Sequence, residues 1–367
     1  MSIKKEDHGG YDYLVLIPAI LLFCFGLIAI YSTSSYMAAQ EMGHSFFYLK
    51  RQLFFGLLGI SLLIIAKNIP AHYYSSLVYP ALILSFVLLV MVFIPGIGAK
   101  VGGASRWIKI GSFSIQPSEL AKISLAMYIA YSMSKKGPIM SSFSKGFLPH
   151  LIIVGSFMVL ILMQPDLGTT VIIGCWLMML LFVGGLNIFK LLFMVILACP
   201  VFYYLMFSAK YRIDRWTAFL HPWEDPQGLG YQIIHSFLAF GSGGVLGVGL
   251  GSSKQKLGFL PEAHTDFVLS IIAEELGLLG VTMVIVLFGV LIIRGIRISL
   301  NAPDLHSSYL ALSISTLIGL QVIINMGVVM GMLPTKGLTL PFLSYGGSSL
   351  LVNLIGVGIL LSISARS

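Results

Sequence analysis

The chain has 367 residues, of which 57% are hydrophobic and only 10% are charged. Soluble domains carry about 25% charged residues, so this composition excludes an ordinary soluble enzyme and indicates a protein embedded in lipid. The formal net charge of +8 could suggest nucleic acid. However, the basic residues lie between apolar segments without an aromatic and basic binding module, so we expect no nucleic acid partner.

Ten apolar segments follow one another along the chain, with no gap long enough to fold separately. A membrane-spanning helix needs about 20 mostly apolar residues. The windows that come close to this length are 12–35, 50–67, 72–94, 117–134, 147–164, 168–186, 188–208, 266–294, 307–332 and 342–364. We predict an all-α integral membrane protein, a polytopic bundle of about ten transmembrane helices, forming a single domain over residues 1–367. Its one long extracellular loop covers residues 209–265.

Basic residues indicate the orientation of the bundle. An even number of spans puts both termini on one side, whose termini and short connections contain Lys4, Lys5, Lys67, Lys135, Lys136, Lys145, Lys190, Arg294, Arg297 and Arg366. The positive-inside rule makes this side cytoplasmic. Further basic residues lie on the opposite face. They could be solvated and paired with nearby acids, but we favour an outward-facing site for an anionic group such as a phosphate.

The first motif on the outer face is GASRWIKIGSFSIQPSELAK, residues 103–122, which contains Arg106. Pro117 is typical of a first helical residue. Glu119 and Lys122 then share one helix face at a spacing of three residues. A lysine one turn inside a span is costly, so we expect these two side chains to form an ion pair. The second motif, QPDLGT, places Asp166 in a tight turn between two spans on the same face.

The long loop contains two further motifs. YRIDRWTAFLHPWEDP, residues 211–226, combines Arg212 and Arg215 with two tryptophans and predicts short helices at the membrane interface. The glycine cluster GSGGVLGVGLG precedes Lys254 and Lys256, but it follows no predicted strand and lacks the ending of a P-loop. We expect a re-entrant or tightly bent segment that faces a cavity, with both lysines as candidate anion ligands.

Acidic residues gather where the long loop meets the eighth span, in LPEAHTDFVLSIIAEEL. Asp266 lies at the outer mouth of this span, and its plainest interpretation is a helix N-cap or a first-turn acid. Around an ideal helix Glu274 lies about 80° from Asp266, and Glu275 about 180° away. Of these two residues only Glu274 could therefore share the cavity of Asp266, and we expect Glu275 to pack against another helix. Carboxylates inside a membrane mark function by default.

One face of the membrane thus collects a polar vestibule around Asp266. Its candidate substrate-binding residues are Arg106, Glu119, Lys122, Asp166, Arg212, Arg215, Lys254, Lys256, Glu262, His264 and Glu274. A divalent cation, Mg²⁺ or Mn²⁺, could be held there by Asp166 or Glu262, although no compact metal-ligand spacing is present. The three cysteines lie inside apolar segments and give no metal or disulfide signal.

These motifs resemble those of the SEDS family of bacterial cell-wall glycosyltransferases, the group that contains FtsW, RodA and the sporulation protein SpoVE. The resemblance covers nearly the whole chain and includes LPTKGLTLPFLSYGGSSL near the C-terminus. The stretches HPWEDPQGLGYQ, GLGSSKQK and SYGGSSL are more similar to the division branch, FtsW, than to RodA. The sequence also resembles SpoVE in having no long cytoplasmic extensions.

The resemblance implies a multi-pass protein of the bacterial cytoplasmic (inner) membrane, with ten spans, both termini cytoplasmic and the active site facing outward. It implies polymerisation of lipid II, an undecaprenyl-diphosphate-linked disaccharide peptide, into glycan strands during cell division. The implied partners are a class B penicillin-binding protein and other divisome proteins. The family's essential aspartate matches Asp266, and its other motif residues match Glu119, Lys122, Asp166, Arg212 and Arg215. By hypothesis, Asp266 is the general base of a reaction that inverts the donor sugar.

The sequence leaves two questions open. A helix N-terminus and nearby cations would lower the pKa of Asp266 and weaken it as a base, whereas burial beside Glu274 would raise that pKa. The function could instead be that of a lipid II flippase or of a non-catalytic division scaffold. We favour the enzyme, because a flippase needs access from both faces and the intramembrane charges crowd the outer half. The halves of the chain also lack the internal repeat typical of transporters.

Overall fold

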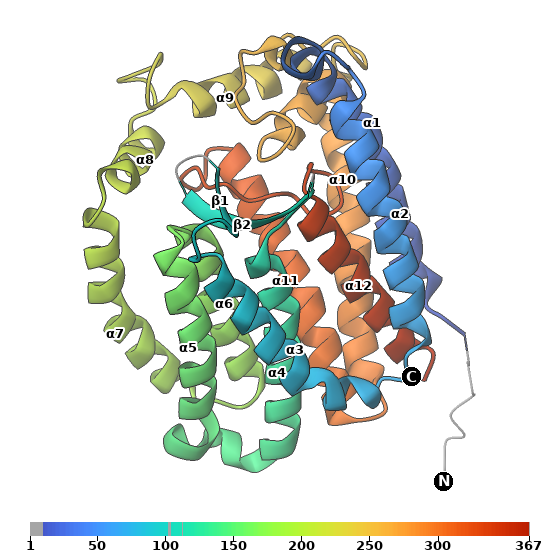
Figure 1. The fold of residues 1–367 in the computed structure, drawn as a ribbon, viewed down its shortest axis with the longest axis vertical. Coiled ribbons are helices and arrows are strands. Elements are labelled where there is room, and N and C mark those ends of the chain that lie inside the picture. Colours follow the sequence, from blue (N-terminus) through green and yellow to red (C-terminus); the bar gives the residue numbers. More distant parts are fainter. Residues whose placement is uncertain (1–9, 102–103, 112, 367) are drawn as a thin grey trace.

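The computed structural model describes residues 10–101, 104–111 and 113–366, and long helices running along one direction dominate it (Figure 1). Ten of them match the predicted windows: α1 (Tyr13–Met42), α2 (Phe47–Asn68), α3 (Tyr73–Met91), α4 (Pro117–Lys136), α5 (Leu148–Met163), α6 (Leu167–Val183), α7 (Ile188–Phe207), α10 (Val268–Asn301), α11 (Leu305–Val329) and α12 (Gly347–Ser364). Eight of these, with α5 counted together with the turn before it as Phe143–Met163, are long and apolar enough to cross a membrane. Of the other two, α6 has 17 residues, and α4 contains charged Glu119 and Lys122. The helical membrane fold is confirmed.

The remaining elements connect these helices. The long loop contains α8 (Lys210–Leu220) and α9 (Tyr231–Gly243). Short interfacial helices were predicted over residues 211–226; one helix, α8, lies there, and its position at the membrane interface stays a prediction. Single helical turns lie at Gly137–Ser141, Phe143–Phe147 and Gln255–Leu257.

The centre of the bundle is formed by α11 and α12. In their most apolar windows 72% and 83% of residues are buried, against 11% in α7. The most extensive packing is that of α12 against α2, and α10 packs against both α11 and α1. The helix α7 lies at the edge of the bundle (Figure 1). It exposes apolar side chains such as Phe189 and Leu197. Such a surface suits contact with lipid tails.

A small antiparallel sheet between α3 and α4 is the element that the all-α prediction missed. Its strands are β1 (Gly98–Val101), β2 (Ala104–Ile110) and β3 (Phe113–Ile115), in the order β1-β2-β3. Side chains alternate between the two faces of a strand, so Arg106 shares a face of β2 with Ala104 and Ile108. Because both of these neighbours are buried, this face points into the protein.

The helix α10 is broken in its N-terminal part, where the glycine-rich segment packs against it. Gly277 adopts φ 64° and ψ −159°, which interrupts the helical ladder. Backbone groups of the glycine-rich segment replace the lost bonds: Val248 N–H donates to the Glu274 carbonyl at 3.0 Å, and Leu278 N–H donates to the Gly244 carbonyl at 2.9 Å. The prediction of a tightly bent segment is confirmed. This exchange satisfies the backbone polar groups, as the interior of a membrane requires.

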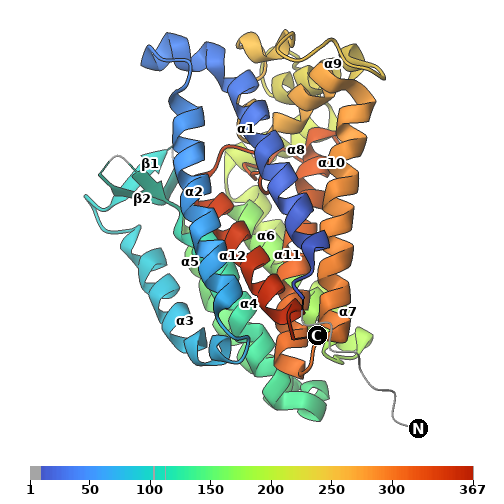
Figure 2. The ribbon, with the colours of Figure 1, turned by 90° about the vertical axis from the view of Figure 1, so that its right-hand side faces the viewer.

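The start and the end of the described chain lie together. The backbone N–H of Asp12 donates to Ser364 Oγ at 3.1 Å, and the Asp12 carboxylate pairs with Arg294 at 2.7 Å. The sheet and α9 lie toward the opposite end of the bundle (Figure 2). An even number of crossings requires this arrangement of the termini. Lys4 and Lys5, which contribute to the orientation argument, lie outside the described residues.

Candidate active site

Asp266 lies in a turn immediately before α10. The helix begins at Val268 with Phe267 as its N-cap residue, and no side chain caps it. The N-cap and first-turn interpretations of Asp266 are therefore wrong. The backbone N–H of Asp266 donates to the Glu262 carbonyl at 3.1 Å, which closes the turn. The Asp266 carboxylate is partly buried and forms no hydrogen bond to any described residue. It is thus available to a substrate.

The surroundings of Asp266 decide the open question about its basicity. The pKa of the Asp266 carboxyl is raised from 3.8 to about 7, mainly by burial and also by the negative charges of Glu262 and Asp166, while Arg215 and Arg106 act to lower it. Burial therefore outweighs the neighbouring cations. A general base works best when its pKa lies near the operating pH.

Asp266 lines a pocket of about 250 Å³, which we call the carboxylate pocket. Its walls come from α2, β2, the turn before α10 and the segment 337–349, and its charged members are Arg51, Arg106, Glu262 and Asp266. The segment approaches closely, since a Cβ atom on Gly337 would lie 3.5 Å from Asp266 Oδ2. This pocket brings together three of the residues predicted from sequence.

A second pocket adjoins the first. Because four of its lining residues are Arg or Lys, we call it the basic pocket. Its charged lining residues are Arg106, Asp166, Arg212, Arg215 and Lys336, and Phe202 and Met206 of α7 add an apolar side. Arg106 and Gly337 line both pockets, which places the pockets next to each other. Arg106 is fixed between them because its guanidinium donates to the carbonyls of Gln164, at 3.1 Å, and Pro165.

The cations of the basic pocket differ in what they already bind. Arg212 is buried and donates to the Leu205 carbonyl and, at 3.2 Å, to Ser208 Oγ at the end of α7. Arg215 is exposed, lies 5.8 Å from the Tyr211 ring centre and forms no ion pair within the described residues. Burial lowers the pKa of Lys336. Arg215 and Lys336 are therefore the cations best able to accept an anionic ligand.

Asp166 forms the predicted turn and also caps α6. Its Oδ1 accepts from the Thr169 N–H at 3.1 Å, and its Oδ2 accepts from Thr169 Oγ1 at 2.9 Å. Asp166 lines the basic pocket, whereas Glu262 lines the carboxylate pocket. Within the described ranges, no group of three or more His, Cys, Asp or Glu side chains is arranged to hold a metal ion. A cation at either acid would need further ligands from the substrate.

Glu119 and Lys122 form the predicted ion pair in the first turns of α4. Lys122 Nζ lies 2.7 Å from Glu119 Oε1, and both side chains are less than one-tenth exposed. Glu119 Oε2 has no hydrogen-bond partner among the described residues. Neither residue lines the carboxylate pocket or the basic pocket. The geometry therefore favours mutual neutralisation.

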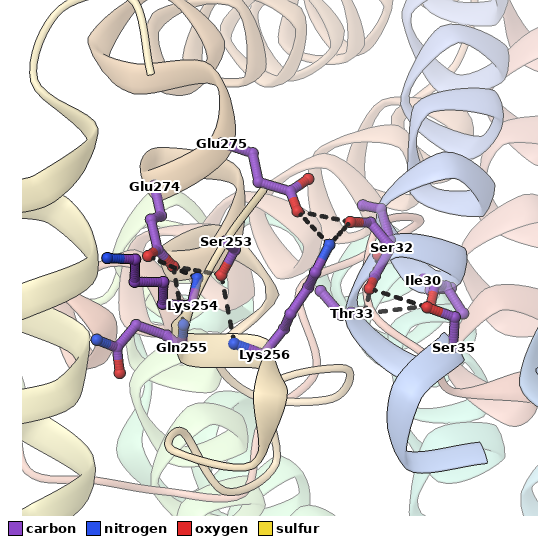
Figure 3. A network of polar contacts seen from close by, with 11 residues as sticks. Ile30, Ser32, Thr33, Ser35, Ser253, Lys254, Gln255, Lys256, Glu274 and Glu275 are labelled. Carbon is purple, nitrogen blue, oxygen red and sulfur yellow. Dashed lines mark hydrogen bonds and ion pairs between the residues drawn. The ribbon is translucent and has the colours of Figure 1, made fainter. Parts of the chain in front are cut away.

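Glu274 does not share the cavity of Asp266, and that expectation is wrong. Its carboxylate instead accepts hydrogen bonds from Ser253 Oγ and from the backbone N–H groups of Lys254, at 3.0 Å, and Gln255, at 3.3 Å (Figure 3). The angular estimate failed because Asp266 precedes the helix, so helical geometry does not relate the two residues. Glu274 fastens the loop after the glycine-rich segment, and the Lys254 side chain is exposed.

Glu275 and Lys256 form a second intramembrane ion pair beside Glu274 (Figure 3). Lys256 Nζ lies 2.9 Å from Glu275 Oε1 and donates to Ser32 Oγ of α1 at 3.0 Å. The expectation that Glu275 serves packing against another helix agrees with this contact. Lys256 lines neither pocket. The structure therefore places it away from the residues around Asp266.

His264 supports the wall of the carboxylate pocket. Its ring centre lies 4.7 Å from that of Tyr48 and 5.8 Å from that of Tyr345. The His264 carbonyl accepts from the Tyr345 N–H at 2.9 Å. Burial lowers the pKa of His264, which keeps the ring neutral near pH 7. Its position is that of a packing residue next to the site.

The model of the FtsW/RodA/SpoVE family, described as cell cycle proteins, matches residues 12–367. The chain belongs to this family. It is 48% identical over 366 residues to the probable peptidoglycan glycosyltransferase FtsW of Geobacter metallireducens, covering 100% of this chain and 97% of that one. It is 46% identical over 368 residues to stage V sporulation protein E of Bacillus subtilis, covering 100% of both.

Solved structures agree with this family membership. One chain comes from a peptidoglycan synthase complex studied for its structural coordination of polymerization and crosslinking. It matches with a TM-score of 0.79 and 29% identity, covering 97% of this chain and 98% of that one. The rod shape determining protein RodA of Thermus thermophilus matches with a TM-score of 0.71 and 27% identity, covering 97% of both chains.

Sequence reasoning missed several residues of this FtsW/RodA/SpoVE site. Lys336 appears in the motif LPTKG, but it has no acidic partner nearby in the sequence, and only the fold brings it beside Asp166 and Arg215. Arg51 is missed as well, because nothing in the sequence of α2 indicates that this residue borders the carboxylate pocket. The family motif itself was the signal that could have drawn attention to Lys336.

Proposed function

We propose that this chain is a peptidoglycan glycosyltransferase that polymerises lipid II at the outer face of the cytoplasmic membrane during cell division. Full-length similarity to proteins named peptidoglycan glycosyltransferase FtsW supports the enzyme class. The single observation that carries the catalytic assignment is the Asp266 carboxylate. It lines a pocket, lacks a hydrogen-bond partner among the described residues and has a pKa raised to about 7.

The reaction joins two sugars and releases a lipid diphosphate. The 4-hydroxyl oxygen of one sugar attacks the anomeric carbon of the other, and the bond from that carbon to the diphosphate breaks with its electron pair. Asp266 accepts the hydroxyl proton as the new bond forms. A single displacement of this kind inverts the anomeric carbon from α to β, so it requires one base and no covalent intermediate.

The basic pocket suits the departing diphosphate. Preorganised cations stabilise charge that develops on a leaving group. The side chains of Arg215 and Lys336 form neither an ion pair nor a hydrogen bond within the described residues, and Arg106 lies between this pocket and the base. An approaching diphosphate favours the protonated form of Lys336, because an opposite charge raises the pKa of an amine. A divalent cation would enter this pocket with the diphosphate and use its oxygens as ligands.

The proposed orientation puts both pockets outside the cell. The end of the bundle that holds Asp12 and Ser364 also holds Arg294, in agreement with the positive-inside rule. The similar chain from a peptidoglycan synthase complex supports a class B penicillin-binding protein as partner. Other divisome proteins are the remaining partners that we propose.

Incubation of the purified protein with labelled lipid II, alone and with its transpeptidase partner, tests this function. We expect glycan polymer from the parent protein and none from the Asp266→Asn variant. A flippase would instead move labelled lipid II across vesicle membranes without forming polymer. A scaffold would do neither. Persistent absence of polymer in the presence of the partner would therefore overturn the proposal.

A further inference from the structure

One buried amide joins the turn of Asp266 to the segment that separates the two pockets. Asn325 lies in α11, and only 1% of its surface is exposed. Its Nδ2 donates to the backbone carbonyl of Asp266 at 3.1 Å and to that of Leu338 at 2.6 Å. Both acceptors are carbonyl oxygens, which only a donor can face, so chemistry fixes the orientation of this amide.

The two carbonyls belong to the parts of the site that must be kept in register. Asp266 carries the proposed base, and Leu338 directly follows Lys336 and Gly337. Lys336 lines the basic pocket, and Gly337 lines both pockets. The Asn325 amide therefore spans the backbone of the base and the backbone of the wall beside it.

The side-chain amide of Asn325 leaves one of its own atoms without a hydrogen-bond partner. Asn325 Oδ1 is buried and accepts no hydrogen bond within the described part of the chain. An unpaired buried oxygen destabilises a fold, and an apolar side chain of similar size would avoid it. Two hydrogen bonds from Nδ2 offset this cost, and both of their carbonyl acceptors lie at the proposed active site.

We propose that Asn325 is a positioning residue for glycan synthesis, which holds the backbone of Asp266 at a fixed place against the Lys336–Gly337 segment. It touches neither sugar nor diphosphate and acts through Asp266. The inference rests on the proposed function, because it assumes that Asp266 is the base. Loss of the tie lets the carboxylate move relative to the basic pocket, and a misplacement of about 1 Å can slow a reaction about 100-fold.

The test replaces Asn325 with leucine and compares the variant with a matched control. Trp176→Phe removes another buried hydrogen bond from a side chain to a carbonyl of α11. In it, Trp176 Nε1 of α6 donates to the Ser313 carbonyl at 3.0 Å. Ser313 lies about 18 Å along that helix from Asn325. With lipid II as substrate, we expect Asn325→Leu to lower kcat by about 10-fold to 100-fold with KM changed less than about 3-fold. Trp176→Phe should leave both parameters near the parent values at a similar loss of Tm.

Three outcomes would overturn the inference: an unchanged kcat in Asn325→Leu, a raised KM with kcat intact, or an equal loss of kcat in Trp176→Phe. If Asn325→Leu fails to fold, Asn325→Asp decides instead, because a protonated carboxyl keeps the shape and one donor. A reduced kcat in that folded variant supports the inference, and a parental kcat overturns it. If the parent protein forms no polymer with its partner, the proposed function fails, and if Asp266→Asn remains active, the assignment of Asp266 as the base fails. If Asp266→Asn is inactive and Asn325→Leu behaves like the control, only this inference fails.

Discussion

The raised pKa of Asp266 leads to a quantitative prediction for the pH dependence of polymerisation. The base must be ionised to accept a proton, and with a pKa of about 7 the ionised fraction rises from about 9% at pH 6 to about 91% at pH 8. We therefore expect kcat/KM to increase about tenfold over this interval. A carboxyl at the ordinary value of 3.8 would stay ionised throughout and would give a flat profile.

Two charge substitutions should move this profile in opposite directions. Glu262 raises the pKa of Asp266, so Glu262→Gln should shift the rising limb to lower pH. Arg215 lowers that pKa, so Arg215→Gln should shift the limb to higher pH. Asp266→Asn removes the base, so its rate should fall by about 100-fold to 10,000-fold at pH 8, where the parental base is ionised, and the rising limb should disappear.

Initial rates with labelled lipid II between pH 5.5 and 9 measure these limbs, and Tm across the same range is the control for folding. The folded protein holds the Asp266 proton more tightly than the unfolded chain does. The contribution of Asp266 to the free energy of unfolding therefore decreases as pH rises from about 4 to about 7. Asp266→Asn should therefore have a Tm equal to or above that of the parent at pH 8. A flat rate profile, or an asparagine variant near the parental rate, would refute the assignment and make Glu262 the next candidate.

The ion pair in α4, the topology and the metal requirement lead to three further predictions. Glu119→Ala should lower Tm because it leaves a buried cation, and adding Lys122→Ala should recover part of that loss. If the single variants fold normally and lose only polymerisation, the pair belongs to the substrate site. In a background without the native cysteines, single cysteines replacing Lys136 and Gln227 should react with a membrane-impermeant reagent from opposite sides of the membrane. Labelling of both from one side would contradict the ten-span topology. Chelation with EDTA should slow polymerisation, and added Mg²⁺ or Mn²⁺ should restore it. Because the diphosphate supplies ligands, the lipid-free protein should show no saturable metal binding. An unchanged rate in EDTA would exclude the cation.

Local chemistry made the helices and one ion pair predictable from the sequence. Ten long apolar windows gave ten helices, because lipid forces each crossing segment to satisfy its own backbone hydrogen bonds. The pair of Glu119 and Lys122 followed from a spacing of three residues within one helix. The sheet between α3 and α4 was missed, although the apolar and polar alternation of Ile108, Lys109 and Ile110 in β2 is typical of a strand.

The remaining parts of the site depend on contacts that are distant in sequence. Asn325 reaches Asp266 across 59 positions, and no local pattern encodes that contact. Lys336 enters the basic pocket because the segment between α11 and α12 folds back over α6 and α8. Even the position of Glu274 relative to Asp266 required the start of α10 to be known to within two residues.

The charged side chains at the end of the bundle that holds the two pockets include paired and unpaired ones, which the sequence alone does not separate. Glu119 with Lys122 and Glu275 with Lys256 are paired at 2.7 and 2.9 Å, which offsets the desolvation that burial imposes on each charge.

Arg215, Lys336 and Asp266 have no ion-pair partner among the described residues and line adjoining pockets. Cations kept unpaired beside a carboxylate of raised pKa suit a substrate that brings both an anionic leaving group and a proton to be removed. An inert scaffold has no use for that arrangement, because pairing these charges would stabilise it further.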